Sequence, residues 1–257
     1  MSGRSFIKIS VLLISSTALA KIDAPLKVAA AADLALAFKD VGAAYEKQTG
    51  QRVIFSFGST GLLEKQIAEG APFDVFAAAN ISFAEDAIKS GACAGDSKAL
   101  YARGRIVIWT RKPNPAPKSV AELADPKWVK IAIANPDHAP YGRAAMQAFE
   151  HAGIALTIKP KLVFGENVQQ TLQFAQSGNV EAAVVALSLA VISDGNYTVI
   201  DDAEHKPIDQ AMVVCGRDPA RTQEARAFTA FVNSPAGRAI MKRYGFLLPG
   251  EVHAKLP

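Results

Sequence analysis

Short apolar strands alternate with amphipathic helices along most of this 257-residue chain. Residues 27–32 predict a strand, and the apolar side chains Leu34, Phe38 and Val41 then recur at helical spacing. The same succession continues toward the C-terminus. Strands that alternate with helices of this length indicate parallel sheets with helices on both faces. We therefore expect an α/β protein.

The pattern of strands and helices restarts after a proline-rich turn at residues 113–117. It also contains too many strands for one sheet in a chain of this length, which predicts two α/β lobes. The apolar strands at 106–109 and 211–214 are the candidates for the two crossings between the lobes. The expected boundaries are 26–106 with 210–257 for one lobe and 107–209 for the other.

The first twenty residues are typical of a secretory signal peptide. Arg4 and Lys8 supply a positive start, residues 9–19 supply an apolar core, and residues 18–20 fit the small-x-small cleavage pattern. The apolar run is shorter than the roughly 20 residues of a membrane-spanning helix. A buried N-terminal helix is the alternative. No lipid-attachment cysteine follows the cleavage site, so we expect an exported protein that is free rather than tethered.

Export would place the two cysteines, Cys93 and Cys215, in an oxidising compartment, where they can form a disulfide. Such a bridge would close a loop of more than 100 residues, for which chain entropy gives a stabilisation of about 4–5 kcal/mol. Two separate buried thiols are the alternative. The distance between the cysteines in the sequence excludes a CxxC redox pair and a cysteine zinc cluster.

Charge and motifs exclude several classes of function. The net charge of +4 is too mild and too dispersed for a nucleic-acid surface. The chain has no HExxH, GxSxG, Walker, GxGxxG or EF-hand motif, and its four histidines are not spaced to share a metal. His138 lies in a turn-rich segment and is interpreted as an exposed or capping histidine. The competing classes are an exported enzyme with Asp33 or His138 as general base, and an adhesive domain without a ligand.

Four turns that lead from a strand into a helix carry small or hydroxyl residues, at 31–33, 58–61, 139–142 and 165–168. The free N–H groups and the positive dipole end of a helix start attract anions, and Ser or Thr hydroxyls add neutral donors. Open α/β sheets bind ligands at the carboxyl ends of their strands. A single turn of this kind is ordinary helix capping. Four of them converging from two lobes predict a site for a small oxyanion.

At these turns the sequence resembles the periplasmic molybdate-binding proteins of ABC importers. The resemblance covers roughly residues 27–249, and its most specific segments are 70–76, 135–142, 165–168 and 185–188. It implies the two-lobed periplasmic-binding-protein fold of type II, with a ligand cleft between the lobes. It also implies that the cleft holds a molybdate or tungstate dianion by hydrogen bonds alone, with no bound cation and no cofactor.

The resemblance implies a set of five ligand-binding residues. Thr60, with Ser59 beside it, matches a hydroxyl ligand of the first lobe, and Asp33 occupies the turn before it. Tyr141 matches a second-lobe ligand that some members supply as a tyrosine and others as a backbone amide. Val168 matches a backbone amide ligand. The implied protein is a monomeric periplasmic receptor without enzymatic activity, which delivers its oxyanion to an ABC permease and the ATPase of that permease.

Two positions depart from the family pattern. Ala186 stands where some members have a ligand tyrosine, for which Tyr141 is the candidate replacement, and Asp33 stands where Ser or Asn is usual. A carboxylate 4 Å from a dianion is repelled by about 4 kcal/mol per unit charge at an effective dielectric constant near 20. Either the Asp33 side chain turns away and caps its helix, or it accepts a hydrogen bond from a protonated oxyanion such as hydrogen phosphate, or the cleft takes a different ligand. The alternative function is therefore a receptor for another tetrahedral oxyanion.

Overall fold

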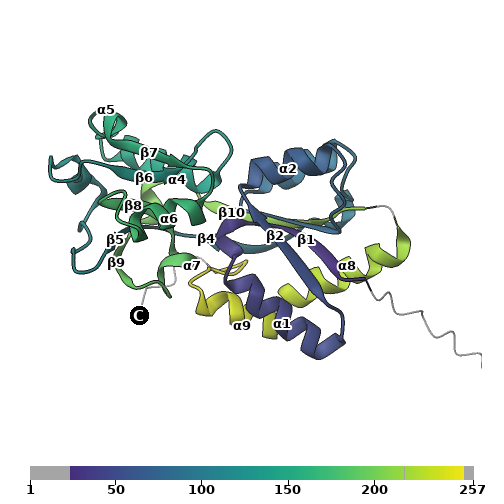
Figure 1. Ribbon diagram of the computed structural model, residues 1–257. Coiled ribbons are helices and arrows are strands. Elements are labelled where there is room, and N and C mark those ends of the chain that lie inside the picture. The colour runs from purple at the N-terminus through teal and green to yellow at the C-terminus, as the bar shows by residue number, and fades with distance from the viewer. Residues whose placement is uncertain (1–23, 217, 252–257) are drawn as a thin grey trace, which may run out of the picture.

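The computed structural model describes residues 24–216 and 218–251, so the expected signal peptide lies outside the described residues. The described chain forms two five-stranded sheets that lie side by side, each packed against helices (Figure 1). The strand order is β2-β1-β3-β10-β4 in one sheet and β7-β6-β8-β5-β9 in the other. We call the first sheet with its helices the first lobe and the second sheet with its helices the second lobe.

The first lobe is built on three parallel strands, with β1 (Leu26–Ala31) between β2 (Val53–Gly58) and β3 (Val75–Ala78). β10 (Ile208–Val214) runs antiparallel to β3 and to β4 (Ala99–Gly104). Alternate residues of β1 and β3 face two different apolar clusters, so helices cover both faces of this sheet. The helices of the lobe are α1 (Ala37–Thr49), α2 (Thr60–Ala68), α3 (Ile81–Lys89), α8 (Pro219–Val232) and α9 (Pro235–Arg243).

In the second lobe, β6 (Ile131–Ala134) pairs in parallel with β7 (Leu162–Gly165) and β8 (Ala182–Ala186). β5 (Ile106–Arg111) runs antiparallel to β8 and to β9 (Gly195–Val199). The helices of the lobe are α4 (Pro140–His151), α5 (Ala155–Ile158), α6 (Val168–Gln176) and α7 (Leu187–Ala190). Short 3₁₀ turns lie at η1 (Ala32–Leu34), η2 (Gly95–Ser97), η3 (Val120–Ala124), η4 (Lys159–Lys161) and η5 (Asp202–Glu204).

The two sheets are mixed, so the expectation of parallel sheets is wrong for the pairings of β5 and β10. Parallel pairing holds where strand, helix and strand follow one another within a lobe, as from β1 through α1 to β2. β5 and β10 instead enter their sheets directly after the chain has crossed from the other lobe, and both run antiparallel to their neighbours. β4 was not predicted from the sequence, because Arg103 and Gly104 interrupt its apolar pattern. The residue boundaries of the two lobes stay a prediction.

An aromatic cluster fills the first lobe between the sheet and α1. Phe38 of α1 is fully buried, and its ring centroid lies 5.7 Å from that of Phe55, 6.0 Å from Tyr101 and 6.1 Å from Phe228. Helical spacing places Phe38 and Tyr45 on one face of α1, toward α8. This packing fixes α1 against the sheet and thereby fixes η1, the turn that enters α1 from β1.

Two long-range links tie the first lobe together at residues distant in sequence. Cys93 and Cys215 form a disulfide with an S–S distance of 2.04 Å. The carboxylate of Asp74 accepts hydrogen bonds from the Lys27 backbone N–H (2.7 Å) and from both Nε and Nη2 of Arg221 on α8. Asp74 belongs to segment 70–76, one of the segments that carry the family resemblance. Its contacts hold β1 and α8 together, and it does not line the cavity between the lobes.

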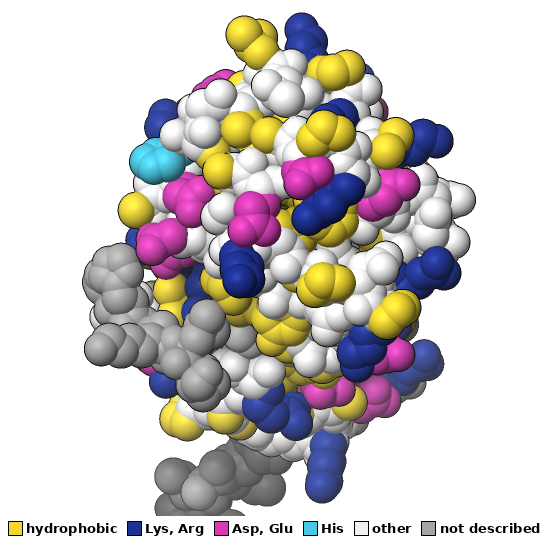
Figure 2. Space-filling model, turned by 90° about the vertical axis from the view of Figure 1, so that its left-hand side faces the viewer, with side chains coloured by type: hydrophobic (Ala, Val, Ile, Leu, Met, Phe, Trp, Pro, Cys, Tyr) yellow, Lys and Arg dark blue, Asp and Glu magenta, His cyan; other side chains and the backbone are white. Residues whose placement is uncertain are grey.

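Figure 2 shows one end of the molecule, on the side of the second lobe. Lys and Arg side chains lie there among Asp and Glu side chains, and the hydrophobic side chains are scattered. This face therefore carries no block of positive charge of the kind that binds nucleic acid. Within the part of the chain that the structure describes, no helix is both long and apolar enough to span a membrane.

Candidate functional site

The four turns singled out in the sequence meet at one cavity between the lobes. Its lining comprises residues 31–33 and 58–60 and Ala79 from the first lobe, and residues 139–141 and 167–168 from the second. All five expected ligand residues, Asp33, Ser59, Thr60, Tyr141 and Val168, are therefore brought together. The cavity volume is about 10 Å³, roughly the room that one water molecule needs. The lobes thus stand nearly closed over a small site.

Three helices begin at this cavity, and their first-turn N–H groups lack partners within the helix. At α6, the Asn167 side chain accepts from the N–H groups of Gln169 and Gln170, at 3.0 and 3.1 Å. The first N–H of α6, that of Val168, is left for the cavity, which Val168 lines. At α4, Pro140 occupies the first position and has no N–H, so Tyr141 presents the first one.

Thr60 is placed to donate its hydroxyl proton into the cavity. It is the first residue of α2 and is 1% exposed. Its Oγ1 accepts a hydrogen bond from the Ala79 backbone N–H at 3.3 Å. Because a hydroxyl can donate and accept at once, this contact orients Thr60 and leaves its proton for a ligand.

Ser59 faces a different partner, His138 of the second lobe. Its Oγ lies 2.7 Å from His138 Nδ1 and 2.8 Å from the His138 carbonyl oxygen. The same carbonyl oxygen accepts the Gly61 N–H at 3.0 Å. The interpretation of His138 as an exposed or capping residue is therefore wrong, because it is half-buried and links the two lobes. The Ser59 hydroxyl is committed to that link.

Asp33 lies at the centre of a hydrogen-bond network that spans both lobes. Its Oδ2 accepts from the Tyr141 hydroxyl at 2.9 Å and from Gln210 Nε2 at 2.7 Å. The residue is 1% exposed, and its other oxygen, Oδ1, is buried without a hydrogen-bond partner. No side chain caps η1, so the expected capping role of Asp33 is wrong. The carboxyl lines the cavity instead.

Burial controls the ionisation of this network. Loss of solvation raises the pKa of Asp33 from 3.8 to about 6, although the hydrogen bonds from Gln210 and Tyr141 act in the opposite direction. Burial and the nearby Asp33 charge raise the pKa of Tyr141 well above its ordinary value. The same two causes raise the pKa of Tyr101. The tyrosine hydroxyls therefore keep their protons. The Tyr141 hydroxyl donates its hydrogen bond to Asp33, so the donor that Tyr141 has left is its backbone N–H.

Four residues that the sequence analysis did not single out complete the network. Gln210 Oε1 accepts from the Tyr101 hydroxyl at 2.7 Å, which orients the Gln210 amide toward Asp33. Ser188 of the second lobe donates to the Asp33 carbonyl oxygen at 2.7 Å. Gly104 leaves room for the approach, because a Cβ there would lie 2.0 Å from the Tyr141 hydroxyl oxygen. Two sequence signals were available for them: a polar Gln inside an apolar strand, and the position of Ser188 in the specific segment 185–188.

The cavity has an unusual charge balance for an anion site. Among the described residues that line it there is no Lys, Arg or His, and the one ionisable carboxyl is Asp33. Its donors are hydroxyl and backbone N–H groups, which suits recognition of an anion by hydrogen bonds alone. In the described residues, no cluster of three His, Cys, Asp or Glu side chains is placed to hold a metal ion.

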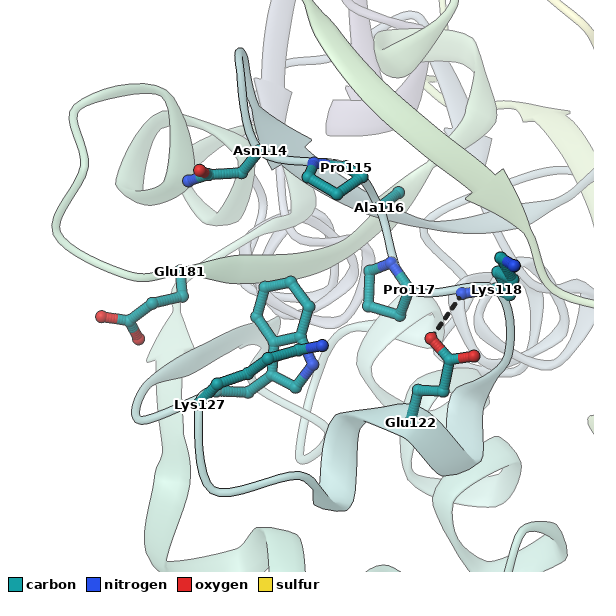
Figure 3. Close-up of a pocket in the computed structure, with 9 residues that line it drawn as sticks. Asn114, Pro115, Ala116, Pro117, Lys118, Glu122, Lys127 and Glu181 are labelled. Atoms are coloured by element: carbon teal, nitrogen blue, oxygen red, sulfur yellow. Dashed lines mark hydrogen bonds between the residues drawn. The ribbon is translucent and has the colours of Figure 1, made fainter.

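A larger hollow, of about 460 Å³, lies on the second lobe and shares no lining residue with this cavity (Figure 3). The proline-rich turn forms one side of it, and the Lys118 N–H donates to Glu122 Oε2 at 3.0 Å. Glu181 and Lys127 also line it, and the Lys127 ammonium lies 5.3 Å from the centroid of the Trp128 ring. Its two carboxylates balance the charges of its two lysines, Lys118 and Lys127, and its volume is large, so this hollow is a poor site for a small dianion.

The sequence profile of the bacterial extracellular solute-binding proteins matches residues 26–247. The chain belongs to this family. The molybdate-binding protein of Azotobacter vinelandii is 37% identical over 231 residues, which cover 87% of this chain and 90% of the relative. The molybdate-binding protein of Rhodobacter capsulatus is 33% identical over 220 residues, which cover 85% of this chain and 86% of that relative. The resemblance stated from the sequence is thus confirmed.

Solved structures of extracellular solute-binding proteins have the same fold. The periplasmic molybdate-binding protein of Azotobacter vinelandii superimposes with a TM-score of 0.82 and 31% identity, covering 87% of this chain and 99% of that one. The sulfate-binding protein of Mycobacterium tuberculosis, at 13% identity and a TM-score of 0.76, shares the fold alone. The expected two-lobed α/β fold is confirmed. Solute-binding proteins serve transport, so an exported enzyme lacks support.

Proposed function

We propose that this chain is the periplasmic receptor that captures molybdate or tungstate for import by an ABC transporter. The observation that carries the proposal is the convergence of four strand-to-helix turns, two from each lobe, on one small cavity whose described lining includes no cationic side chain. Two relatives above 30% identity that share most of the chain are molybdate-binding proteins. The cavity chemistry supports the same class of ligand, a small oxyanion.

The proposed ligand set is Asp33, Ser59, Thr60, Tyr141 and Val168, in three roles. Thr60 donates its hydroxyl proton, and the first-turn N–H groups of Tyr141 and Val168 donate from the two helix starts of the second lobe. Ser59 contributes through its position at the start of α2, because its hydroxyl is bonded to His138. An anion of the wrong size would leave some of these buried donors unpaired, which is the proposed source of selectivity.

Ligand binding is proposed to shift an equilibrium between open and closed lobes. The lobes touch through Asp33 and Tyr141 beside the cavity and through Ser59 and His138 at its edge. A tetrahedral oxyanion is larger than a water molecule, so the lobes must part to admit it and then close around it. The closed monomer would dock on the permease, whose ATPase drives transport, and no cofactor or nucleic acid takes part.

The second candidate is a receptor for another tetrahedral oxyanion, and Asp33 is the observation that favours it. An ionised carboxylate in a cavity without cations repels a dianion, whereas it accepts a hydrogen bond from an anion that carries its own proton. Hydrogen phosphate is such an anion near neutral pH.

Titration calorimetry on the mature chain, residues 21–257, tests these two candidates. Molybdate, tungstate, sulfate, phosphate and chromate are compared at low micromolar protein. We expect molybdate and tungstate to bind most tightly, and T60A to weaken them by about 1–3 kcal/mol through loss of a buried donor. T222A is the matched control, since Thr222 is half-buried on α8 and does not line the cavity. Tight binding of phosphate without binding of molybdate would reject the first candidate in favour of the second.

A further inference from the structure

Asp33 Oδ1 is a buried polar atom that the fold leaves unpaired. The other oxygen of the same carboxyl, Oδ2, already accepts two hydrogen bonds, from Tyr141 and Gln210. Oδ1 has no partner, and the residue that carries it is 1% exposed and lines the oxyanion cavity. Buried polar groups are almost always hydrogen-bonded in folded proteins. An unpaired one in a cavity therefore points to a ligand.

We propose that the bound complex holds one proton between Asp33 Oδ1 and an oxygen of the oxyanion, so that each dianion enters together with one proton. The inference rests on the proposed oxyanion-binding function and adds a specificity-determining role for Asp33. Without this proton, three negative charges would share a cavity whose described lining contains no cation. With it, the repulsive contact becomes a hydrogen bond, and Asp33 joins the other neutral donors of the site.

The geometry assigns the proton to Oδ1 rather than to Oδ2. Oδ2 is held as an acceptor by two donors, the Tyr141 hydroxyl and the Gln210 amide. The amide is itself oriented, because its Oε1 accepts from Tyr101. A proton on Oδ2 would have to displace one of these donors, whereas a proton on Oδ1 displaces nothing. The network thus turns the protonated face of the carboxyl toward the cavity.

The ionisation of Asp33 in the closed form supports the same arrangement. Burial raises the pKa of this carboxyl to about 6 even before a dianion is present. A dianion next to Oδ1 favours the protonated form further, because like charges disfavour ionisation. At neutral pH the free carboxyl is mainly ionised, so the proton must be taken up when the ligand binds.

No charged side chain on the packed elements competes for this role. The ionisable groups that face Asp33 are the hydroxyls of Tyr141 on α4 and Tyr101 on β4. β2, α6 and α7 contain no ionisable side chain. Four ionisable groups on the other neighbouring segments have partners of their own: Arg103 with Asp209, Arg105 with the Gly245 carbonyl, Arg143 with the Pro136 and Asp137 carbonyls, and His138 with Ser59. Three more lie at distant ends of β1 or α4: Lys27, Glu150 and His151.

The test measures proton uptake and affinity together on the mature chain. Molybdate and sulfate are titrated between pH 6 and pH 8, in buffers that differ in their enthalpy of ionisation. Phosphate is left out because it gains its own proton in this range. We expect uptake of about one proton per anion near pH 8 and about half a proton near pH 6, where the free carboxyl is already half protonated. The affinity should therefore fall about fivefold from pH 6 to pH 7 and about tenfold from pH 7 to pH 8, about 50-fold over the range.

The variant D33N separates this proton from the rest of the site. Its amide can donate toward the cavity while its carbonyl oxygen accepts from Tyr141 and Gln210, so it should bind the anion with no pH slope and no proton uptake. D137N is the matched control, since Asp137 is an exposed acid in the loop before α4 that does not line the cavity. It should keep the wild-type slope. A circular-dichroism spectrum equal to that of the wild type verifies that each variant is folded.

Two outcomes would overturn the inference and leave the site intact. One is wild-type binding that is independent of pH and takes up no proton, a result that needs no variant. The other is tight, pH-independent binding by D33N while the wild type binds no anion at any pH, which would make Asp33 a barrier to anions. If neither the wild type nor D33N binds any oxyanion, the proposed function itself is rejected.

Discussion

The hydroxyl of Tyr141 lies 2.9 Å from Oδ2 of Asp33 and thereby joins α4 of the second lobe to η1 of the first. Both residues are buried, and the Tyr141 hydroxyl oxygen also accepts a hydrogen bond from Gln210 Nε2 at 3.1 Å. It gives Tyr141 a role other than the direct hydroxyl ligand that some members of the family use. The side chain links the two lobes, and in the proposed site the backbone N–H binds the anion.

Y141F should therefore weaken oxyanion binding by opening the lobes rather than by removing a ligand atom. Loss of a hydrogen bond to a charged group costs about 1.5–3 kcal/mol, or roughly 10- to 150-fold in affinity. Calorimetry gives the affinity, and small-angle scattering on the free protein gives the shift toward the open form. Y197F is the control, since Tyr197 is 41% exposed on β9. A scattering curve unchanged by Y141F would contradict the closing role.

G104A should interfere with the same contact from the other side. A Cβ at Gly104 would lie 2.0 Å from the Tyr141 hydroxyl oxygen and 2.9 Å from Gln210 Nε2, so the tyrosine must move and the lobes cannot close as they do now. We expect at least a tenfold loss of affinity with a folded first lobe. The double variant G104A/Y141F lacks the clashing oxygen, so its loss of affinity should be smaller than the two single losses combined. Losses that combine independently would contradict the steric explanation.

The sequence was sufficient to predict the turns of the site but not the network behind them. Thr60 and Val168 follow strands directly, so their place at a sheet edge could be inferred from local pattern alone. Gln210 and Gly104 come from strands whose neighbours are set by the lobe crossings, and the antiparallel course of these strands was not anticipated. The partner of Asp33 was unpredictable for the same reason. Local sequence favours a helix-capping role for Asp33, but its carboxyl instead accepts a hydrogen bond from Tyr141, which is 108 residues away in the sequence.

The disulfide should contribute stability without affecting the site. Cys93 and Cys215 are separated by 122 residues, and neither lines the oxyanion cavity. Replacing both by alanine should lower the free energy of unfolding by about 2–5 kcal/mol. Chemical denaturation measures this loss, and the oxyanion affinity of the folded variant should stay at the wild-type value. A wild-type protein whose stability does not change on addition of a reductant would argue for two free thiols.

The Asp74 and Arg221 pair should be a second source of stability. Their side chains are 13% and 17% exposed, and Arg221 also donates to the carbonyl oxygens of Ala24 and Pro25. D74A leaves Arg221 with the carboxylate of Glu224 alone, 3.3 Å from its Nη1, and should cost about 3 kcal/mol of unfolding free energy. D96A is the matched control, because its pair with Arg226 is exposed and should contribute less than about 1 kcal/mol. Similar losses for the two variants would contradict the importance of burial.

The buried carboxyl of Asp33 should make the ligand-free protein less stable as pH rises. Its pKa is 3.8 in the unfolded reference and about 6 in the closed fold, so between these values the folded chain binds more protons than the unfolded chain. The free energy of unfolding should therefore fall by about 2 kcal/mol from pH 4 to pH 7 because of this group. D33N lacks the titration, so the difference in stability between wild type and D33N, measured by denaturant unfolding at each pH, isolates it. A difference that is constant from pH 4 to pH 7 would show that the carboxyl keeps its ordinary pKa in the free protein, as an open and hydrated cleft would require.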